Sequence, residues 1–323
     1  MRPSFLVIDK PAGITSHDVV ALVRAVTGSK KVGHTGTLDP FATGVLPLAI
    51  GGVTRLIQFL DESIKVYDAT IRFGFATDTG DPTGVSIREA PLPTVDRAQL
   101  DAILSTFLGD RMQEPPAYSA VKVQGRPLYH YARKGEEVRA AARPVKIHDI
   151  RVLDWSPPES LRIEITCSRG TYARVLADEI AVALGSAGHL SALSRTRSGP
   201  FFFDDALSIQ QLAEIVSSEP GKSWEEVLLS RGPRESRVRW NSRDHVDAGV
   251  ERWLKSPVAC LPNLPLVDVQ PVVAKRIRSG GNLPAAPGGV PFGGKFLVVC
   301  GDDVVAVGEH ATTGPKALRV VES

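Results

Sequence analysis

The chain has 323 residues, 43% of them hydrophobic and 23% charged, which is ordinary for a soluble globular protein with one large domain and a small one. Its three cysteines, Cys167, Cys260 and Cys300, are too few and too scattered for a disulfide framework or a metal site, and no apolar run is long enough to span a membrane. The first ten residues lack the pattern of a signal peptide, so we expect a cytoplasmic protein, and a net charge of +2 does not by itself indicate a nucleic-acid partner.

The first predicted elements are a short strand and an amphipathic helix. The apolar run Phe-Leu-Val-Ile at 5–8 predicts a buried strand, and a turn follows it at 9–13. Thr15 or Ser16 can cap the next segment, whose apolar positions fall on one helical face. These positions are Val19, Val20, Leu22, Val23 and Val26. The residues from Gly28 onward end this helix and lead into a loop.

Residues 33–47 are predicted to form that loop, because three glycines and two prolines interrupt both helical and strand periodicity. The loop carries a single carboxylate, Asp39, and an imidazole, His34, and the apolar run that follows at 45–50 should be buried. A single carboxylate on a loop that packs against the hydrophobic core is a candidate catalytic group. The alternative is a structural turn in which Asp39 bonds to its own backbone.

The segment 64–75 alternates well enough to predict a strand, with Tyr67 near its start. An Asp-Thr-Gly triplet follows at 78–80. Aspartic proteases carry the same triplet, and in their active site two such aspartates share one proton. The triplet occurs once and its flanking sequence fits another pattern. We therefore interpret Asp78 and Asp81 as hydrogen-bond acceptors in a turn.

A helix is predicted at 97–108, and the amino-acid composition changes after it. Residues 111–146 hold eight Lys or Arg and three Glu, a local net charge of +5, with aromatic rings interleaved. The rings are Tyr118, Tyr129, His130 and Tyr131. Basic groups neutralise phosphates and rings stack on bases, so this pattern favours RNA contact. The alternative is a solvent-exposed surface segment that binds no partner.

Residues 161–167 alternate cleanly and predict a strand, after which a turn leads into another helix. Cys167 is not the nucleophile of a cysteine phosphatase, because that loop needs an arginine six residues later and position 173 is alanine. Arg174 stands at the start of the helix, where its charge gains nothing from the helix dipole. This mild cost indicates a residue held there for a partner.

Beyond residue 200 the pattern is less regular. Residues 208–230 predict one helix. Residues 231–257 are arginine-rich and lack a regular apolar spacing, which is typical of a linker or an insertion. From about residue 262, short apolar runs separated by glycine turns, with one helix near 274–280, predict a small β-rich module.

The loop sequence Gly-His-Thr-Gly-Thr-Leu-Asp-Pro-x-Ala-Thr-Gly-Val-Leu-Pro at 33–47 resembles the signature loop of the TruB family of tRNA pseudouridine synthases. The resemblance is strong from about residue 5 to 200 and weak near the C-terminus. It implies that Asp39 is the essential carboxylate, that Tyr67 stacks on the target base and takes a proton, and that Arg174 pairs with Asp39. A guanidinium beside the carboxylate would keep it ionised at neutral pH.

The same resemblance implies substrate-binding roles. His34 would fill the space left by the extracted base, and Tyr172 and Leu193 would line the base pocket together with Tyr67. Lys10 belongs to a stretch, Lys-Pro-x-Gly-x-Thr-Ser at 10–16, that resembles the family motif thought to buttress the catalytic loop. Its side chain would either contact phosphate or be a solvated turn lysine. The stretch 115–135 resembles the thumb insertion that grips the T loop of tRNA.

By resemblance the fold is α+β, with a mixed, mostly antiparallel central sheet, flanking helices and a β-rich C-terminal module. We expect a catalytic domain at 1–230 with the thumb-like insertion at about 111–146. A linker or insertion at 231–261 and a PUA-like RNA-binding domain at 262–323 would follow it.

The implied activity is isomerisation of uridine to pseudouridine at position 55 in the T-arm loop of tRNA. The reaction adds no atoms and changes no redox state, and the sequence has no nucleotide-binding loop or metal-ligand spacing, so we expect no cofactor. The expected partner is the T stem-loop of tRNA, with no membrane and with the chain acting as a monomer. The alternative function is an RNA-binding or tRNA-folding chaperone in which catalysis is dispensable.

Overall fold

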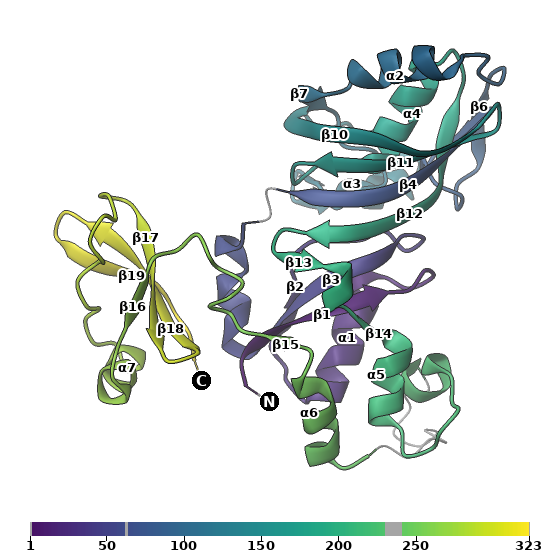
Figure 1. Cartoon of the computed structure of the whole chain (residues 1–323). Coiled ribbons are helices and arrows are strands. Elements are labelled where there is room, and N and C mark those ends of the chain that lie inside the picture. Colours follow the sequence, from purple (N-terminus) through teal and green to yellow (C-terminus); the bar gives the residue numbers. More distant parts are fainter. Residues whose placement is uncertain (1, 62–63, 230–240, 323) are drawn as a thin grey trace. The chain divides into compact units, whose positions relative to one another are not determined.

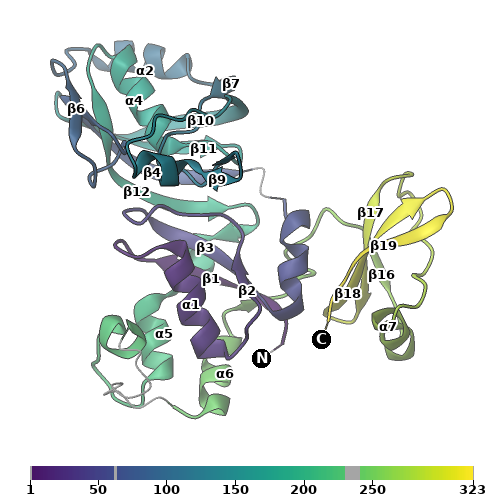
Figure 2. The same ribbon diagram turned by 180° about the vertical axis from the view of Figure 1, so that it is seen from behind.

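The computed structural model describes residues 2–61, 64–229 and 241–322, and the chain forms two compact units, drawn from opposite sides in Figures 1 and 2. Unit 1 contains Met1–Pro40, Gly44–Asp61 and Pro200–Ser323. Unit 2 contains Phe41–Thr43 and Glu62–Gly199. The predicted three-part division at 230 and 261 does not follow these units and stays a prediction.

The sheet of unit 1 is built around β1 (Ser4–Lys10), whose residues are almost all buried. On one edge β1 pairs antiparallel with β3 (Thr43–Ile50), and β2 (Val32–His34) pairs with β3 in turn. The other edge of β1 pairs with β14 (Leu207–Ser208) and β15 (Leu254–Lys255). The predicted strand at 5–8 and the buried run at 45–50 are therefore confirmed.

Helix α1 (Ser16–Thr27) confirms the first predicted helix and decides which residue caps it. Thr15 is the N-cap, and it forms a capping box with Asp18, in which each side chain bonds the other residue's backbone N–H. Gly28 ends the helix in the left-handed conformation, with φ of 63°, which glycine adopts without steric cost. The apolar face predicted from the valines and leucine is buried.

The prediction of one helix over 208–230 is wrong. Helix α5 (Ile209–Val216) ends at Val216, and a short helix, η3 (Glu225–Leu229), follows after a break that contains Pro220 and Gly221. Apolar residues at helical spacing stand on both sides of the break, but residues 217–223 are polar apart from a proline and a glycine, which together interrupt the backbone hydrogen bonds.

The segment that we expected to be a linker is partly described: residues 231–240 lie outside the described residues, and the remainder begins at residue 241. It contains helix α6 (Arg243–Glu251) and strand β15, which extends the sheet at β1. The amide of Asn241 donates to the carbonyl oxygens of Ile215 and Ser217, both at 2.9 Å, at the end of α5. The described part of this segment is thus integrated into unit 1.

The C-terminal part of unit 1 is β-rich, as predicted. Its sheet runs in the order β16-β17-β18-β19, and α7 (Pro271–Arg278) covers it. The strands are β16 (Leu266–Asp268), β17 (Lys295–Cys300), β18 (Asp303–Ala311) and β19 (Gly314–Val320).

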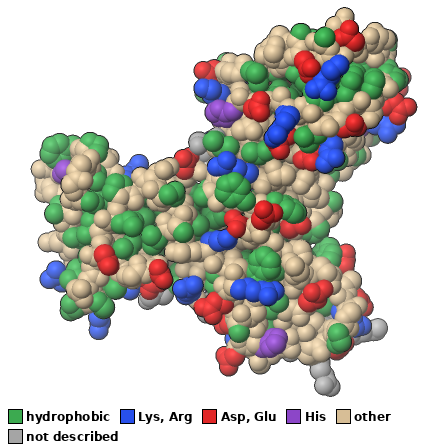
Figure 3. Space-filling view, viewed as in Figure 1, with side chains coloured by type: hydrophobic (Ala, Val, Ile, Leu, Met, Phe, Trp, Pro, Cys, Tyr) green, Lys and Arg blue, Asp and Glu red, His purple; other side chains and the backbone are tan. Residues whose placement is uncertain are grey.

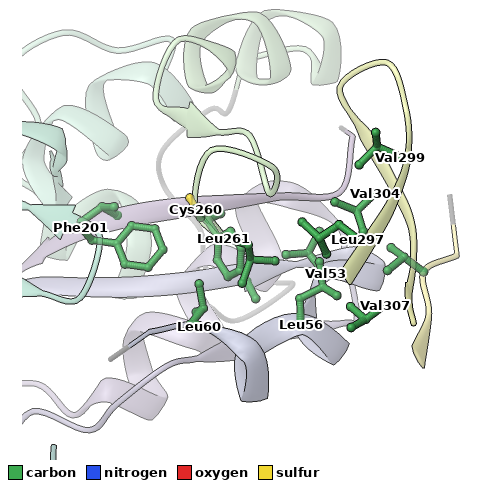
Figure 4. Close-up of a cluster of buried hydrophobic side chains, with 14 of the residues drawn as sticks. Val53, Leu56, Leu60, Phe201, Cys260, Leu261, Leu297, Val299, Val304 and Val307 are labelled. Carbon is green, nitrogen blue, oxygen red and sulfur yellow. The ribbon is translucent and has the colours of Figure 1, made fainter. Parts of the chain in front are cut away.

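Alternate residues of β17 enter two different cores. Phe296 and Val298 pack with residues of α7, whereas Leu297 and Val299 pack with residues of β1 and η1 (Gly51–Phe59). Figure 4 shows the second of these clusters, in which side chains of the C-terminal strands meet those of the N-terminal sheet. The C-terminal module therefore shares a hydrophobic core with the rest of unit 1.

Unit 2 is organised on an antiparallel sheet in the order β12-β4-β11-β10-β7. Its strands are β4 (Lys65–Phe73), β7 (Gly109–Gln113), β10 (Arg143–Ser156), β11 (Ser160–Cys167) and β12 (Gly188–Ser198), with a hairpin of β5 (Phe75–Thr77) and β6 (Ser86–Glu89). Helices α2 (Arg97–Ser105) and α4 (Ala173–Ala183) also belong to it. These elements confirm the strands and helices that the sequence predicted between 64 and 184, and both units confirm the α+β fold class.

The basic segment 111–146 begins and ends inside this sheet, because β7 pairs with the start of β10 from Gln113↔Arg143 to Gly109↔Ile147. The excursion proper therefore runs from 114 to 142. It contains a small hairpin, β8 (Lys122–Val123) and β9 (Arg126–Pro127), and the short helix α3 (Leu128–Ala132). Figure 2 shows β9 on the side of the sheet that is turned away in Figure 1.

Candidate functional site

Asp39 lies in unit 1 on the loop that follows β2, and its side chain is half-buried. The turn at 10–16 holds the peptide groups on both sides of it. On one side, the Ser16 hydroxyl accepts from Leu38 N at 2.9 Å and donates to Leu38 O at 3.1 Å. On the other side, the Gly13 N–H donates to Pro40 O at 2.8 Å. The backbone at Asp39 is thus fixed from both neighbours.

Lys10 contributes to the same arrangement, and it is not the solvated turn lysine that was one of our two expectations. Its side chain is fully buried, and its ammonium group donates to the carbonyl oxygens of Pro11 (2.8 Å), Ile14 (2.8 Å) and Pro40 (3.2 Å). An ammonium carries three N–H groups, so these carbonyl oxygens offer one acceptor for each of them. Lys10 therefore stabilises the turn and the loop from inside the protein.

His34 ends β2, directly before the loop, and is half-buried. Its ring meets the ring of His17 edge to face, with the centroids 5.5 Å apart. The next peptide group is also fixed, because Thr35 N donates to Pro47 O at 3.0 Å. The structure therefore places His34, Asp39 and Lys10 on one loop-and-turn assembly of unit 1.

Two of the expected pocket residues lie together in unit 2. Tyr67 on β4 is paired with Arg195 on β12, and Leu193 is paired with Ala69, two positions further along β4. Since paired residues and residues two apart share a face, Tyr67 and Leu193 are diagonal neighbours on one face of the sheet. Both are 7% exposed.

Arg174 belongs to unit 2 as well, near the start of α4, and is only 4% exposed. Its guanidinium donates to Thr79 O at 2.6 Å and to Tyr118 O at 2.8 Å. It therefore ties the turn after β5 to the root of the excursion. Gly80 has a φ of 71°, which L side chains rarely adopt, and an added Cβ would make a tight contact of 3.2 Å with the Cβ of Arg174.

The residue that fixes Tyr172 was not predicted from the sequence. Gln113 is buried at the end of β7, and its amide oxygen accepts from Tyr172 N at 2.7 Å while its amide nitrogen donates to Tyr172 O at 3.2 Å. This two-point contact sets the backbone of Tyr172 just before α4. Nothing in the local sequence at Gln113 indicates it, because its partner is 59 residues away.

The two aspartates after β5 are turn acceptors, as predicted. Oδ1 of Asp81 accepts from the Thr79 hydroxyl at 2.7 Å and from Thr83 N at 2.9 Å, and Oδ1 of Asp78 accepts from Val85 N at 2.9 Å. These carboxylates hold the turn whose Thr79 carbonyl accepts from Arg174.

Three of the four rings of the basic excursion divide into a buried and an exposed group. Tyr131 is buried and its hydroxyl donates to Val123 O at 3.1 Å, so it supports the hairpin. Tyr129 and His130 are exposed, and the Arg133 guanidinium lies 5.4 Å from the ring centroid of Tyr129. The exposed rings are accessible to a partner, as the prediction of RNA contact requires.

The described residues offer neither a reactive thiol at Cys167 nor a metal-binding cluster. Burial raises the pKa of the Cys167 thiol to about 11, which leaves it a poor nucleophile at neutral pH. Among the described residues, no group of three or more His, Cys, Asp or Glu side chains could hold a metal ion. No helix in the described part of the chain is long and apolar enough to cross a membrane. On the face shown in Figure 3, acidic and basic side chains are interspersed over unit 2.

The structure thus groups Lys10, His34 and Asp39 in unit 1 and Tyr67, Tyr172, Arg174 and Leu193 in unit 2. The expected pairing of Arg174 with Asp39 joins the two units and stays a prediction.

Comparison with known proteins gives consistent matches. Residues 24–173 match the family model described as TruB family pseudouridylate synthase (N terminal domain). Over 224 residues the chain is 48% identical to tRNA pseudouridine synthase B of Geotalea uraniireducens, which covers 69% of this chain and 71% of that protein. Over 316 residues it is 36% identical to tRNA pseudouridine synthase B of Ruegeria pomeroyi, which covers 98% of this chain and 94% of that protein.

Among solved structures, the chain is similar to one in a crystal structure of a Cbf5-Nop10-Gar1 complex. The TM-score is 0.66 at 26% sequence identity, and the match covers 99% of this chain and 83% of that one. The similarity extends over nearly the whole chain, including the C-terminal module.

Proposed function

The chain belongs to the TruB family of pseudouridylate synthases, and on that premise we propose that it acts at uridine 55 in the T arm of tRNA with Asp39 as the essential carboxylate. The coarser activity follows from the family and the named relatives: the protein is a tRNA pseudouridine synthase, an enzyme that isomerises uridine in tRNA. Position 55 and the roles of individual residues are the proposal.

The reaction breaks the bond between C1′ of the ribose and N1 of uracil, turns the base and forms a bond between C1′ and C5. The proton on C5 leaves, and N1 gains a proton, so the product is an isomer of the substrate. In the proposed mechanism Asp39 either attacks covalently or stabilises a cationic sugar while the base turns. Both routes need an ionised carboxylate at a fixed place, because a displacement of about 1 Å can cost about 100-fold in rate.

The observation that carries the assignment of Asp39 is the hydrogen bonding on both of its sides. Bonds from Ser16, Gly13 and Lys10 hold the peptides of Leu38 and Pro40. A turn carboxylate with no function does not require such support from a buried lysine. Asp39 itself is half-buried, which suits a group that must meet a base withdrawn from solvent.

We propose that Tyr67, Leu193 and Tyr172 hold the uracil, with the Tyr67 ring stacked on it and able to take a proton. Extracting the base from the folded loop costs a few kcal/mol of stacking and pairing. Contacts of the excursion with the T loop would offset this cost, and His34 would occupy the space that the base leaves. Arg174 would then pair with Asp39 and keep it anionic.

The remaining proposals concern organisation. The excursion at 114–142 would act as the thumb on the T stem-loop, and the C-terminal β-rich module would be a PUA-like RNA-binding domain that begins near residue 262. The catalytic domain would occupy 1–230 with 231–261 as the connection, and the chain would act as a monomer.

The experiment uses an unmodified tRNA transcript and its isolated T-arm stem-loop. Wild-type protein should convert uridine 55 in both, and Asp39→Asn should bind the transcript but form no pseudouridine. A transcript with cytidine at position 55 should give no product. Product at another uridine would overturn the position, and product from Asp39→Asn at the wild-type rate would overturn the carboxylate. Stoichiometric binding without any modified base from wild-type protein would favour the RNA chaperone.

A further inference from the structure

Two cations of unit 1 converge on one carboxylate that follows β19. The ammonium of Lys31, directly before β2, donates to Oε2 of Glu322, 291 residues further along the chain. The guanidinium of Arg55, on η1, donates to Oε1 of the same carboxylate at 2.8 Å. The fold therefore brings together two positive groups from different elements, and one carboxylate binds both.

The backbone beside Glu322 is held in place. Arg55 donates through its second terminal nitrogen to Val320 O at 2.8 Å, and Val321 is 2% exposed, in the same hydrophobic cluster as residues of η1. A Cβ at Gly52 would lie 2.4 Å from Glu322 O, so the glycine leaves room for the chain to lie against η1. The Glu322 carboxylate can therefore leave both cations by rotation of its own side chain, without displacement of the backbone.

The contact itself is weak, because all three side chains are exposed. The exposed fraction is 57% for Lys31, 43% for Arg55 and 53% for Glu322, so water and salt screen the attraction. The hydrogen bond from Lys31 and the charge of Arg55 lower the pKa of the Glu322 carboxyl, which is therefore ionised at neutral pH. An anion from outside the protein can displace a carboxylate that is held in this way.

The cation pair suits a phosphodiester. A phosphodiester offers two charged oxygens, as the carboxylate does, and both lysine and arginine bind phosphate. Lys31 stands three residues before His34, and an extended strand rises about 3.3 Å per residue, so the two residues are about 10 Å apart along β2. An RNA whose uridine reaches the loop after His34 has its backbone within reach of Lys31.

We propose that Glu322 competes with a backbone phosphate of tRNA for Lys31 and Arg55. In the free protein the carboxylate covers the cation pair, and in the complex a phosphate takes both donors while the Glu322 side chain turns into solvent. This inference rests on the proposed function in one respect, since it places the substrate at the loop of His34 and Asp39. It assigns to Glu322 a role in the affinity for tRNA and none in the chemical step.

The test measures the Kd for an unmodified tRNA transcript at several salt concentrations, together with the thermal unfolding midpoint. Glu322→Gln keeps the size of the side chain but removes its charge, and we expect it to lower the Kd about two- to fivefold. Lys31→Gln should raise the Kd and reduce the slope of log K against log salt by about one, because one phosphate contact is lost.

Two comparisons separate this effect from a general change in charge. Asp101→Asn is the matched control, since it also removes one exposed carboxylate from an ion pair, with Arg97 on α2, and it should leave the Kd nearly unchanged. In a Lys31→Gln/Arg55→Gln background, Glu322→Gln should give no gain in affinity, because no cation remains for it to release.

Several results would overturn the proposal. These are an unchanged or higher Kd in Glu322→Gln, an equal gain in Asp101→Asn, or a gain that persists without the two cations. A lower unfolding midpoint with a constant Kd would show that the ion pairs only stabilise the fold, which also overturns it. The Kd does not depend on formation of the modified base. If Asp39→Asn is active while Glu322→Gln binds more tightly, the role of Asp39 fails and this inference holds; if Asp39→Asn is inactive and Glu322→Gln binds as the wild type does, only this inference fails.

Discussion

Replacing Lys10 with methionine is the most informative change to the framework of the site. Methionine has nearly the length of the lysine stem and fills the same space, but it cannot donate a hydrogen bond. The substitution removes the bonds from the ammonium to the carbonyl oxygens of Pro11, Ile14 and Pro40.

The expected loss of stability follows from these three bonds. Hydrogen bonds from a charged donor contribute about 1.5–3 kcal/mol each when the site is buried. Pro40 O keeps the Gly13 N–H as a donor, and Pro11 and Ile14 are half-buried, so water can replace part of what is lost. We therefore expect the free energy of unfolding to fall by about 2–3 kcal/mol in Lys10→Met.

Urea denaturation of the free protein measures this loss, with Lys30→Met as the control. Lys30 is exposed, so its substitution should change the free energy of unfolding by less than about 0.5 kcal/mol. The rate of pseudouridine formation should also fall in Lys10→Met, because the Pro40 side of Asp39 loses one of its two donors.

A phosphate contact at Lys10 would give the opposite pattern of stability and tRNA binding. If Lys10 contacted a phosphate of tRNA, Lys10→Met would leave the stability of the free protein unchanged. It would instead weaken tRNA binding and reduce the slope of log K against log salt by about one.

Cys260, the excursion hairpin and Gly80 each give a measurable expectation. Burial raises the pKa of the Cys260 thiol to about 12, so the protonated thiol adds stability that is complete only below the pKa of the unfolded chain and is lost as the pH rises above it. Cys260 should therefore contribute a fall of about 1.4 kcal/mol per pH unit to the free energy of unfolding, in addition to the fall from Cys167. Denaturation curves from about pH 8 to 11 should be shallower by that amount in Cys260→Ala. Replacing the exposed Lys122 and Arg126 of the excursion hairpin with alanine should reduce the salt dependence of tRNA binding by about one unit of slope per residue and leave the unfolding midpoint unchanged; an unaltered slope would exclude phosphate contacts at this hairpin. Gly80→Ala should destabilise the protein by about 1–2 kcal/mol in urea, because it places a side chain at φ of 71° and against Arg174, whereas Gly135→Ala, at φ of 72° with open space around it, should cost less.

Much of the fold could be predicted because local signals agreed with tertiary structure. The capping residues before α1, the alternation at 161–167 and the apolar spacing at 97–108 each reflect forces that act within one element. Strand β10 was not predicted, since irregularities in its pairing between Ile147 and Asp149 and between Val152 and Asp154 interrupt the alternation that marks a strand.

The site was harder to predict in its supporting contacts than in its central residues. The loop around Asp39 has a long, specific sequence, but the roles of Ser16 and Gln113 depend on partners 22 and 59 residues away. Lys10 was expected to be accessible because lysine is seldom buried; here three nearby carbonyls satisfy its ammonium. Only the folded chain shows these contacts.

The role of Asp39 in the reaction is tested by following the proton at C5 of uracil. A tRNA transcript with tritium at C5 of its uridines is mixed with excess protein, and tritium released to water is counted, since C5 loses its hydrogen when it bonds to C1′. We expect release of one equivalent per tRNA by the wild-type chain and none by Asp39→Asn, with tRNA bound equally by both. Release by Asp39→Asn at the wild-type rate would contradict it.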